Sequence, residues 1–160
     1  MSKIKNKTLF NLILLFSIFA LLAAYFIQYV LKHQPCNLCL IERIPYFIAI
    51  IITSICLFFD KFERISFIIL SIVFFSGTLI ACYHFGIEQG LIMESLVCDL
   101  NNDNSDLSKE ALLKQLKEVS VSCKEVTFKI FGLSLATINI VISLILSIIT
   151  MKHFINYEKN

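Results

Sequence analysis

The chain has 160 residues, of which 58% are hydrophobic and 16% are charged, and its formal net charge is +2. Ordinary globular domains carry about 25% charged residues, so this chain has too little polar side-chain surface to cover a soluble fold. The small positive charge forms no basic stripe, which argues against a nucleic-acid partner. The composition therefore indicates a polytopic membrane protein surrounded by lipid.

Four long apolar runs predict four membrane-spanning helices. They cover residues 8–31, 40–59, 65–85 and 130–151. Each run is close to the roughly 20 residues that a helix needs to cross a bilayer, and none alternates as a half-buried strand would. The first run is longer than the apolar part of a signal peptide, so we expect it to be retained. We expect an all-α, four-transmembrane-helix bundle that forms a single membrane domain over residues 1–160.

The positions of lysine and arginine predict the orientation. Three lysines precede the first helix, two basic residues lie in the turn at 60–64, and two more follow the fourth helix. Short cytoplasmic segments of membrane proteins are enriched in these residues. We therefore expect both termini in the cytoplasm, with two loops, at about 32–39 and 86–129, facing outward.

Four of the six cysteines fall in these two outward-facing loops. The loop cysteines are Cys36, Cys39, Cys98 and Cys123. Disulfides persist in oxidising compartments and are rare in the cytosol, so the cysteines agree with an orientation that was derived from lysines. Cys56 and Cys82 fall inside helices, where we expect them to be buried and to act as small hydrophobic residues.

The Cys36-x-x-Cys39 pair is typical of redox chemistry. Closing so short a ring removes little entropy from the unfolded chain, so a purely structural disulfide is the weaker explanation. A structural zinc ion would need four converging ligands, and His33 is the one histidine near this pair in the sequence. Redox chemistry is favoured, with a structural disulfide and a zinc site as open alternatives.

The residues after this pair suggest how one thiol is activated. If the second helix begins near Cys39, the positive end of the helix stabilises a thiolate there. Arg43 follows four residues later on the same helical face, and its charge lowers the pKa of the Cys39 thiol further. Pro45 suits a first helical turn and would kink a helix already under way. Snorkelling of Arg43 to the membrane interface is the alternative.

Three stretches resemble the disulfide bond formation protein B (DsbB) family. CNLCLIERIPY at 36–46 is similar to the CxLCxxxRxPY signature of that family. YHFGIEQG at 83–90 resembles its YHxGxExG segment at the end of the third helix, and Ser122-Cys123 followed by FGLSL at 131–135 and by Asn139 resembles the entry to its fourth helix. The resemblance covers the whole chain in order. Two departures concern the long loop and the fourth helix: the chain has no tryptophan, and Leu96-Val97 stands where the family often has a proline before the third cysteine.

The resemblance implies a quinone-coupled thiol oxidase of the bacterial inner membrane. Such proteins reoxidise a periplasmic thioredoxin-fold oxidase of the DsbA type. It implies that Cys98 and Cys123 form the disulfide that receives the partner's electrons, with Cys98 making the mixed disulfide. The electrons would then pass to the Cys36–Cys39 disulfide and on to a bound ubiquinone or menaquinone. Cys39 would engage the quinone and Arg43 would help to bind it.

Two further features lie near this predicted site. His84, at the outer end of the third helix, is a candidate quinone-binding residue, with a structural interfacial role as the alternative. Residues 107–118 place leucines at helical spacing opposite charges, which predicts a short amphipathic helix on the membrane surface, or otherwise a solvated loop.

Two other functions compete with the thiol oxidase. One is a membrane thiol reductase of the vitamin K epoxide reductase type, in which the Cys-x-x-Cys motif lies in a late helix. The other is a non-enzymatic membrane scaffold held by structural disulfides. A relay disulfide exchanges readily with thiols, whereas a structural one resists glutathione-level reductants.

Overall fold

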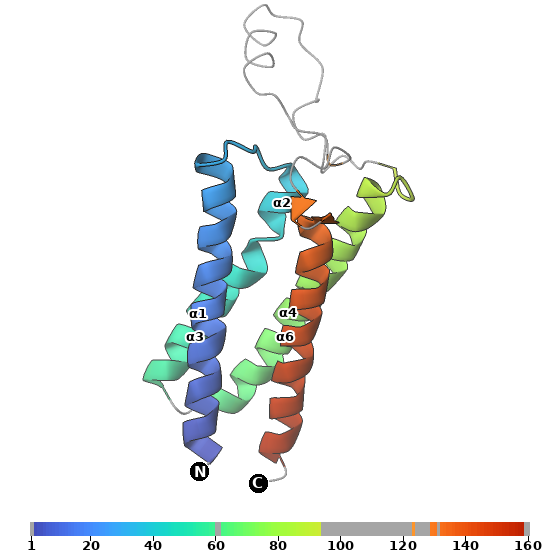
Figure 1. Ribbon diagram of the computed structural model, residues 1–160. Coiled ribbons are helices and arrows are strands. Elements are labelled where there is room, and N and C mark those ends of the chain that lie inside the picture. Colours follow the sequence, from blue (N-terminus) through green and yellow to red (C-terminus); the bar gives the residue numbers. More distant parts are fainter. Residues whose placement is uncertain (1, 60–61, 94–122, 124–128, 131, 159–160) are drawn as a thin grey trace, which may run out of the picture.

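Four long helices run side by side in the computed structural model, which describes residues 2–59, 62–93, 123, 129–130 and 132–158 (Figure 1). The elements are α1 (Ser2–Tyr29), α2 (Asn37–Ile41), α3 (Ile44–Phe58), α4 (Glu63–Glu88), β1 (Lys129–Ile130), β2 (Leu133–Ser134) and α6 (Leu135–Glu158). Four segments of this helical structure are long and apolar enough to cross a membrane: Asn6–Tyr29, Asn37–Phe58, Glu63–Glu88 and Leu135–Asn156. The predicted four-helix membrane bundle is confirmed.

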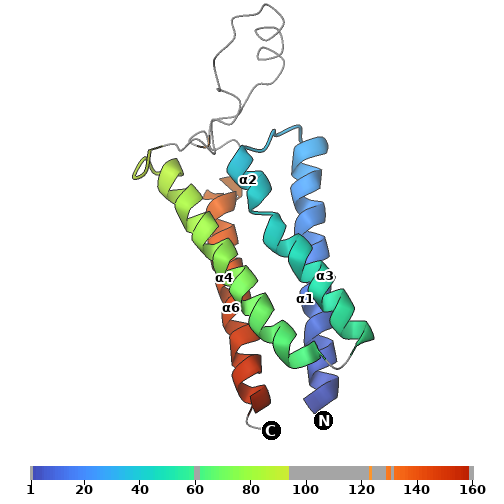
Figure 2. The ribbon, with the colours of Figure 1, turned by 180° about the vertical axis from the view of Figure 1, so that it is seen from behind.

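The helices bury small and aromatic side chains against one another and leave large apolar ones outside. α1 packs on α3, α3 on α4, and α4 on α6, as both views show (Figures 1 and 2). Phe10 of α1 stacks on Phe67 of α4 with ring centroids 4.5 Å apart. Phe19 and Phe58 are 69% and 83% exposed, because a bilayer solvates apolar side chains that water would not.

Hydroxyl groups join α4 to α6 in the middle of the bundle. The Ser71 hydroxyl donates to the Ser147 carbonyl at 3.1 Å, and the Ser147 hydroxyl donates to the Ser71 carbonyl at 3.0 Å. Small residues let two helix backbones approach, and their hydroxyls then form bonds between helices. This pair of bonds is part of the packing between α4 and α6, which determines the face that α6 presents to the site.

The second spanning segment is broken, which corrects the prediction of one helix over 40–59. α2 ends at Ile41 and α3 begins at Ile44, with Pro45 in its first turn. Proline has no N–H to donate and suits a helix start, so the backbone turns here. The Pro45 ring packs against Gly77 of α4, where an added Cβ would lie 3.1 Å from the Pro45 Cγ.

The fourth long helix starts later than the predicted residue 130. Residues 129–130 and 133–134 form an antiparallel pair, with Ile130 opposite Leu133. Gly132 has a φ of 82° in the connection, a conformation that glycine adopts without steric cost. α6 therefore begins at Leu135, where the Ser134 hydroxyl accepts the Thr137 backbone N–H.

Both chain termini lie at one end of the bundle, and α2 and the two strands lie at the other (Figure 1). The short connection 30–36 and the C-terminal end of α4 belong to the α2 end. The predicted amphipathic helix at 107–118 lies outside the described residues and stays a prediction.

Candidate redox site

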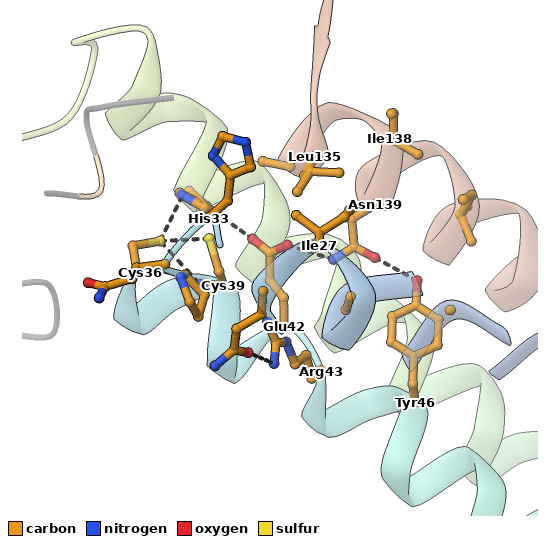
Figure 3. Close-up of a pocket in the computed structure, with 18 of the residues that line it drawn as sticks. Ile27, His33, Cys36, Cys39, Glu42, Arg43, Tyr46, Leu135, Ile138 and Asn139 are labelled. Carbon is orange, nitrogen blue, oxygen red and sulfur yellow. Dashed lines mark hydrogen bonds and ion pairs between the residues drawn. The ribbon is translucent and has the colours of Figure 1, made fainter. Parts of the chain in front are cut away.

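Cys36 is the residue that caps the start of α2. Its backbone is extended, with φ −70° and ψ 167°, and its sulfur accepts the backbone N–H of Cys39 at 3.3 Å. The two sulfur atoms lie 2.7 Å apart, and both cysteines are free thiols in this structure (Figure 3). A disulfide requires close Cβ atoms with suitable backbone positions, and a Cys-x-x-Cys turn at a helix start supplies them.

The low-pKa thiol of this pair is Cys36. Its pKa is lowered from 9.0 to about 5, chiefly because the Cys39 side chain hydrogen-bonds to its sulfur. His84 lowers the pKa further by hydrogen bonding and by charge, whereas burial opposes both effects. The sequence predicted that α2 would begin near Cys39 and activate that thiol. The predicted start of the helix was wrong, because α2 begins at Asn37 and therefore places Cys36 at the positive end of the helix.

His84 connects Cys36 to a buried carboxylate. The His84 Nε2 atom lies 3.5 Å from the Cys36 sulfur, and the His84 Nδ1 atom lies 2.6 Å from Glu42 Oε1. All three residues are buried, with 3% of His84 and 8% of Glu42 exposed. Cys36 lies at the start of α2, Glu42 at its end, and His84 on α4. The histidine therefore lies between a thiol and a carboxylate.

The same carboxylate is held from α6. The Asn139 amide donates to Glu42 Oε2 at 2.8 Å, and the Tyr46 hydroxyl donates to Asn139 Oδ1 at 2.6 Å (Figure 3). The Ser143 hydroxyl also donates to Asn139 Oδ1 at 3.2 Å. An ionised carboxylate can only accept hydrogen bonds, so this chain of donors fixes which way the Asn139 amide points.

Arg43 turns toward α1. Its Nη1 atom donates to Gln28 Oε1 at 2.7 Å, and its guanidinium lies 5.0 Å from the centre of the Tyr25 ring. Within the part of the chain that the structure describes, Arg43 thus contacts α1, whereas the sequence predicted that it would lie beside Cys39. It lines the same cavity as the cysteine pair.

A largely apolar cavity of about 240 Å³ opens beside the thiols. Its apolar wall comes from α1 and α6: Ala20, Ala24, Ile27, Leu135, Ala136, Ile138 and Ile142. The polar residues and cysteines that line it are Gln28, His33, Gln34, Cys36, Cys39, Glu42, Arg43, Tyr46, His84, Glu88 and Asn139, and several of them are drawn in Figure 3. Apolar pockets with a few converging polar groups are the usual form of a small-molecule site.

A metal ion is the weaker use of this group. The ligand atoms of Cys36, Cys39 and His84 lie within 4.8 Å of one another. Structural zinc sites take four such ligands, and the cluster among the described residues has three members. The donor set fits paired-thiol chemistry better than it fits a closed metal site.

The second cysteine pair reaches the same region. Cys123 is disulfide-bonded and 2% exposed, and it packs in one cluster with Cys36, Leu38 and Ile87. Cys98 lies outside the described residues, so its pairing with Cys123 stays a prediction.

The two remaining cysteines lie away from the site. Cys56 is buried, as predicted, and its thiol donates to the Ser66 hydroxyl at 2.7 Å. Cys82 differs from the expectation of burial, because it lies exposed on the outer surface of α4. It is therefore a free thiol outside the cavity.

Sequence reasoning assigned no role in the site to Glu42, Tyr46 or Asn139. A carboxylate inside an apolar segment is costly unless it is paired, and this was the available signal for Glu42. Its partners are far away in the chain, since His84 is 42 residues later and Asn139 is 97 residues later.

Four membrane-spanning segments around a Cys-x-x-Cys pair define a multi-pass membrane protein of thiol–disulfide chemistry. The chain belongs to the DsbB family, whose sequence model, "Disulfide bond formation protein DsbB", matches residues 6–152. It is a membrane disulfide-bond formation protein and a protein-disulfide oxidoreductase. It is also 29% identical over 141 residues to "Uncharacterized protein RP370" of Rickettsia prowazekii (strain Madrid E), covering 86% of this chain and 82% of that protein. No solved structure matches the chain.

Proposed function

We propose that this protein is a quinone-coupled thiol oxidase of the bacterial inner membrane. It reoxidises a periplasmic thioredoxin-fold oxidase of the DsbA type and passes the electrons through Cys98–Cys123 and then Cys36–Cys39. Both termini are cytoplasmic, and the α2 end of the bundle faces the periplasm. The observation that carries the proposal is that Cys36 and Cys39 line the apolar cavity while the disulfide-bonded Cys123 packs in the same cluster as Cys36.

The cavity fits a lipid-soluble quinone in shape and in polarity. The lining residues from α1 and α6 are mostly apolar, and the polar lining includes the cation of Arg43 together with His84. Glu88, which lines the cavity from the end of α4, has a buried Oε2 atom with no hydrogen-bond partner among the described residues, so it can accept a hydrogen bond from a hydroxyl of the reduced quinol. A quinone held there would accept two electrons and two protons from a dithiol.

The chain's own residues order the thiol steps. Cys123 is buried beside Cys36, which suits it to exchange electrons with the Cys36–Cys39 pair. Cys98 is then the cysteine that reacts with the partner. Thiol–disulfide exchange proceeds by attack of a thiolate, and the low pKa of Cys36 keeps it in that form at neutral pH. Arg43 and His84 are proposed to bind the quinone.

Quinone reduction by the purified protein in lipid tests this function. With a reduced DsbA-type partner present, we expect continuous reduction of ubiquinone or menaquinone, and none without the partner. Cys39→Ser should abolish turnover, whereas the matched control Cys82→Ser, a free thiol outside the cavity, should keep it. Continued turnover in Cys39→Ser, or oxidation of the partner over many turnovers without quinone, would show that the proposal is wrong.

A trapping experiment tests the order of the thiols. Cys123→Ala should accumulate a mixed disulfide between Cys98 and the partner, because the second cysteine needed to complete the exchange is missing. Non-reducing electrophoresis and peptide mapping identify the joined cysteines. A mixed disulfide through Cys36 instead would reverse the proposed order.

A further inference from the structure

The oxidation of a dithiol releases protons as well as electrons, and the buried position of Cys36 raises the question of where its proton goes. Only 6% of Cys36 is exposed, so bulk water is a poor acceptor. Apart from the neighbouring Cys39 thiol, the described group in contact with this sulfur is the imidazole of His84, with Nε2 at 3.5 Å from the sulfur. This inference rests on the proposed function, but it concerns a step that occurs without quinone and without the partner.

We propose that His84 is the base that takes the proton from the Cys36 thiol, and that Glu42 is its positioning residue. In this step the S–H bond of Cys36 breaks and an N–H bond forms at His84 Nε2. No electrons leave the pair, and the products are a thiolate and an imidazolium. A nucleophile, a base and a group that orients the base are the general parts of an activated thiol.

The hydrogen-bond pattern selects the histidine tautomer that this step requires. Glu42 accepts hydrogen bonds when it is ionised, so the proton on neutral His84 resides on Nδ1, 2.6 Å from Glu42 Oε1. Nε2 then carries a free lone pair directed at the Cys36 sulfur. After the transfer, the same carboxylate stabilises the imidazolium across that 2.6 Å contact.

α6 holds the carboxylate in place. Asn139 donates to Glu42 Oε2 at 2.8 Å, and Tyr46 donates to Asn139 Oδ1 at 2.6 Å. Because Oε2 is occupied by this amide, Oε1 remains directed at His84. Buried polar networks of this kind are rigid when every member has its partner.

The other ionisable groups around His84 do not replace this arrangement. Glu88, one turn later on α4, lies 3.8 Å from Nε2, the atom that must stay free to accept the proton. Cys39, Arg43 and His33 line the same cavity, and so does the Tyr46 hydroxyl. The cavity-lining residues that α1 and α6 contribute are all uncharged. Glu42 is therefore the acid that faces Nδ1.

A pH titration of the Cys36 thiolate tests the proposal on the reduced, full-length protein. The ultraviolet absorbance of the thiolate is recorded against pH, and the titration of Cys36→Ser is subtracted as background. The wild type should titrate at about pH 5. Glu42→Gln should move this midpoint upward by about one pH unit or more, since the imidazolium loses its counter-charge, and His84→Gln should move it at least as far.

Matched variants separate positioning from a general change of charge. Glu88→Gln removes the same charge from a neighbouring carboxylate and should shift the midpoint less than Glu42→Gln does. Glu42→Asp, which keeps the charge, should recover part of the shift. Equal shifts in the two glutamine variants, or an unchanged midpoint in Glu42→Gln, would overturn the role of Glu42, and an unchanged midpoint in His84→Gln would overturn that of His84.

A variant in α6 gives a second route if Glu42→Gln does not fold. Asn139→Ala leaves both Glu42 and His84 in place but removes the donor to Oε2. It should raise the midpoint of the Cys36 titration by less than Glu42→Gln does. An unchanged midpoint would overturn the proposal that Asn139 holds the Glu42 carboxylate in place. Because no quinone and no partner enter these titrations, their outcome is independent of the proposed oxidase function.

Discussion

Arg43 shows how one side chain can serve packing and binding together. It donates to Gln28 and lies over the Tyr25 ring, so it connects the turn between α2 and α3 to α1. The planar guanidinium can form such a bond while stacking on an aromatic ring, which an ammonium group cannot do as well. At the same time it lines the apolar cavity, where it is the one lysine or arginine among the described lining residues.

Replacing this arginine should weaken quinone binding. For Arg43→Ala we expect the apparent quinone KM to rise on the order of tenfold, about 1.4 kcal/mol, while one turnover of partner oxidation by the Cys98–Cys123 pair is retained. Arg43→Lys should recover part of the loss, because charge returns without the planar group. Quinone reduction is measured against quinone concentration and normalised to folded protein.

The control for this prediction lies at the other end of α4. Arg64 also lies over an aromatic ring, 5.6 Å from the centre of Phe154, but it does not line the cavity. Arg64→Ala should therefore leave the quinone KM unchanged. Unchanged kinetics in Arg43→Ala, with only a loss of folded protein, would show that Arg43 is a snorkelling residue without a part in binding.

At the scale of the elements, polar contacts hold the helices together at both ends of the bundle. At the α2 end the contacts are those of Glu42 with His84 and Asn139. At the end with the termini, the Asn6 amide of α1 donates to Glu63 Oε2 of α4 at 3.1 Å. Glu63 is 1% exposed, and its Oε1 atom has no partner among the described residues.

Removing the Asn6 amide should therefore destabilise the bundle. Asn6→Leu leaves the buried Glu63 carboxyl without this donor, which costs about 1–3 kcal/mol. The further change Glu63→Leu should restore most of the stability, since no unpaired polar atom remains. Asn11→Leu, a change of the same kind at an exposed position of α1, should cost little. The free energy of unfolding in detergent is measured for the wild type, the two single variants and the double variant. A value for Asn6→Leu equal to that of the wild type would contradict the prediction.

At the scale of the whole molecule, the bundle has two chemically different ends. The start of α1, which carries Lys3, Lys5 and Lys7, and the end of α6 lie at one end, and α2, which Cys36 caps, lies at the other (Figure 1). α4 connects the two over 26 residues, roughly 39 Å at 1.5 Å per residue, which exceeds the roughly 30 Å of a bilayer core. The two ends of α4 are therefore expected on opposite sides of the membrane.

Labelling of single introduced cysteines tests this orientation. Met93, after α4, is 92% exposed, and Phe62, before it, is 47% exposed. A membrane-impermeant maleimide added to intact spheroplasts should label Met93→Cys, as well as Cys98 and Cys123 after reduction. It should not label Phe62→Cys or a cysteine at position 61, which itself lies outside the described residues. Labelling of a cysteine at position 61 or 62 from the periplasmic side would show that the proposed orientation is wrong.

The sequence by itself determined the four spanning segments, because a bilayer demands long apolar runs and the chain contains four of them. It also singled out the Cys36-x-x-Cys39 pair, since local spacing alone brings two thiols together at a helix start. The DsbB resemblance that residues 36–46 carried is confirmed by the family match. The break between α2 and α3 could be foreseen only in part, through Pro45.

The tertiary structure decided which thiol is activated and by what. Whether Cys36 or Cys39 caps α2 depends on where the helix begins, and a shift of three residues exchanges their surroundings. The groups of the site come from separate parts of the chain, since His84, which contacts Cys36, belongs to α4, and Asn139, which donates to Glu42, belongs to α6. Their meeting at Glu42 depends on how α4 and α6 are rotated about their axes. That rotation is set by packing between helices, and spacing along a single chain does not contain it.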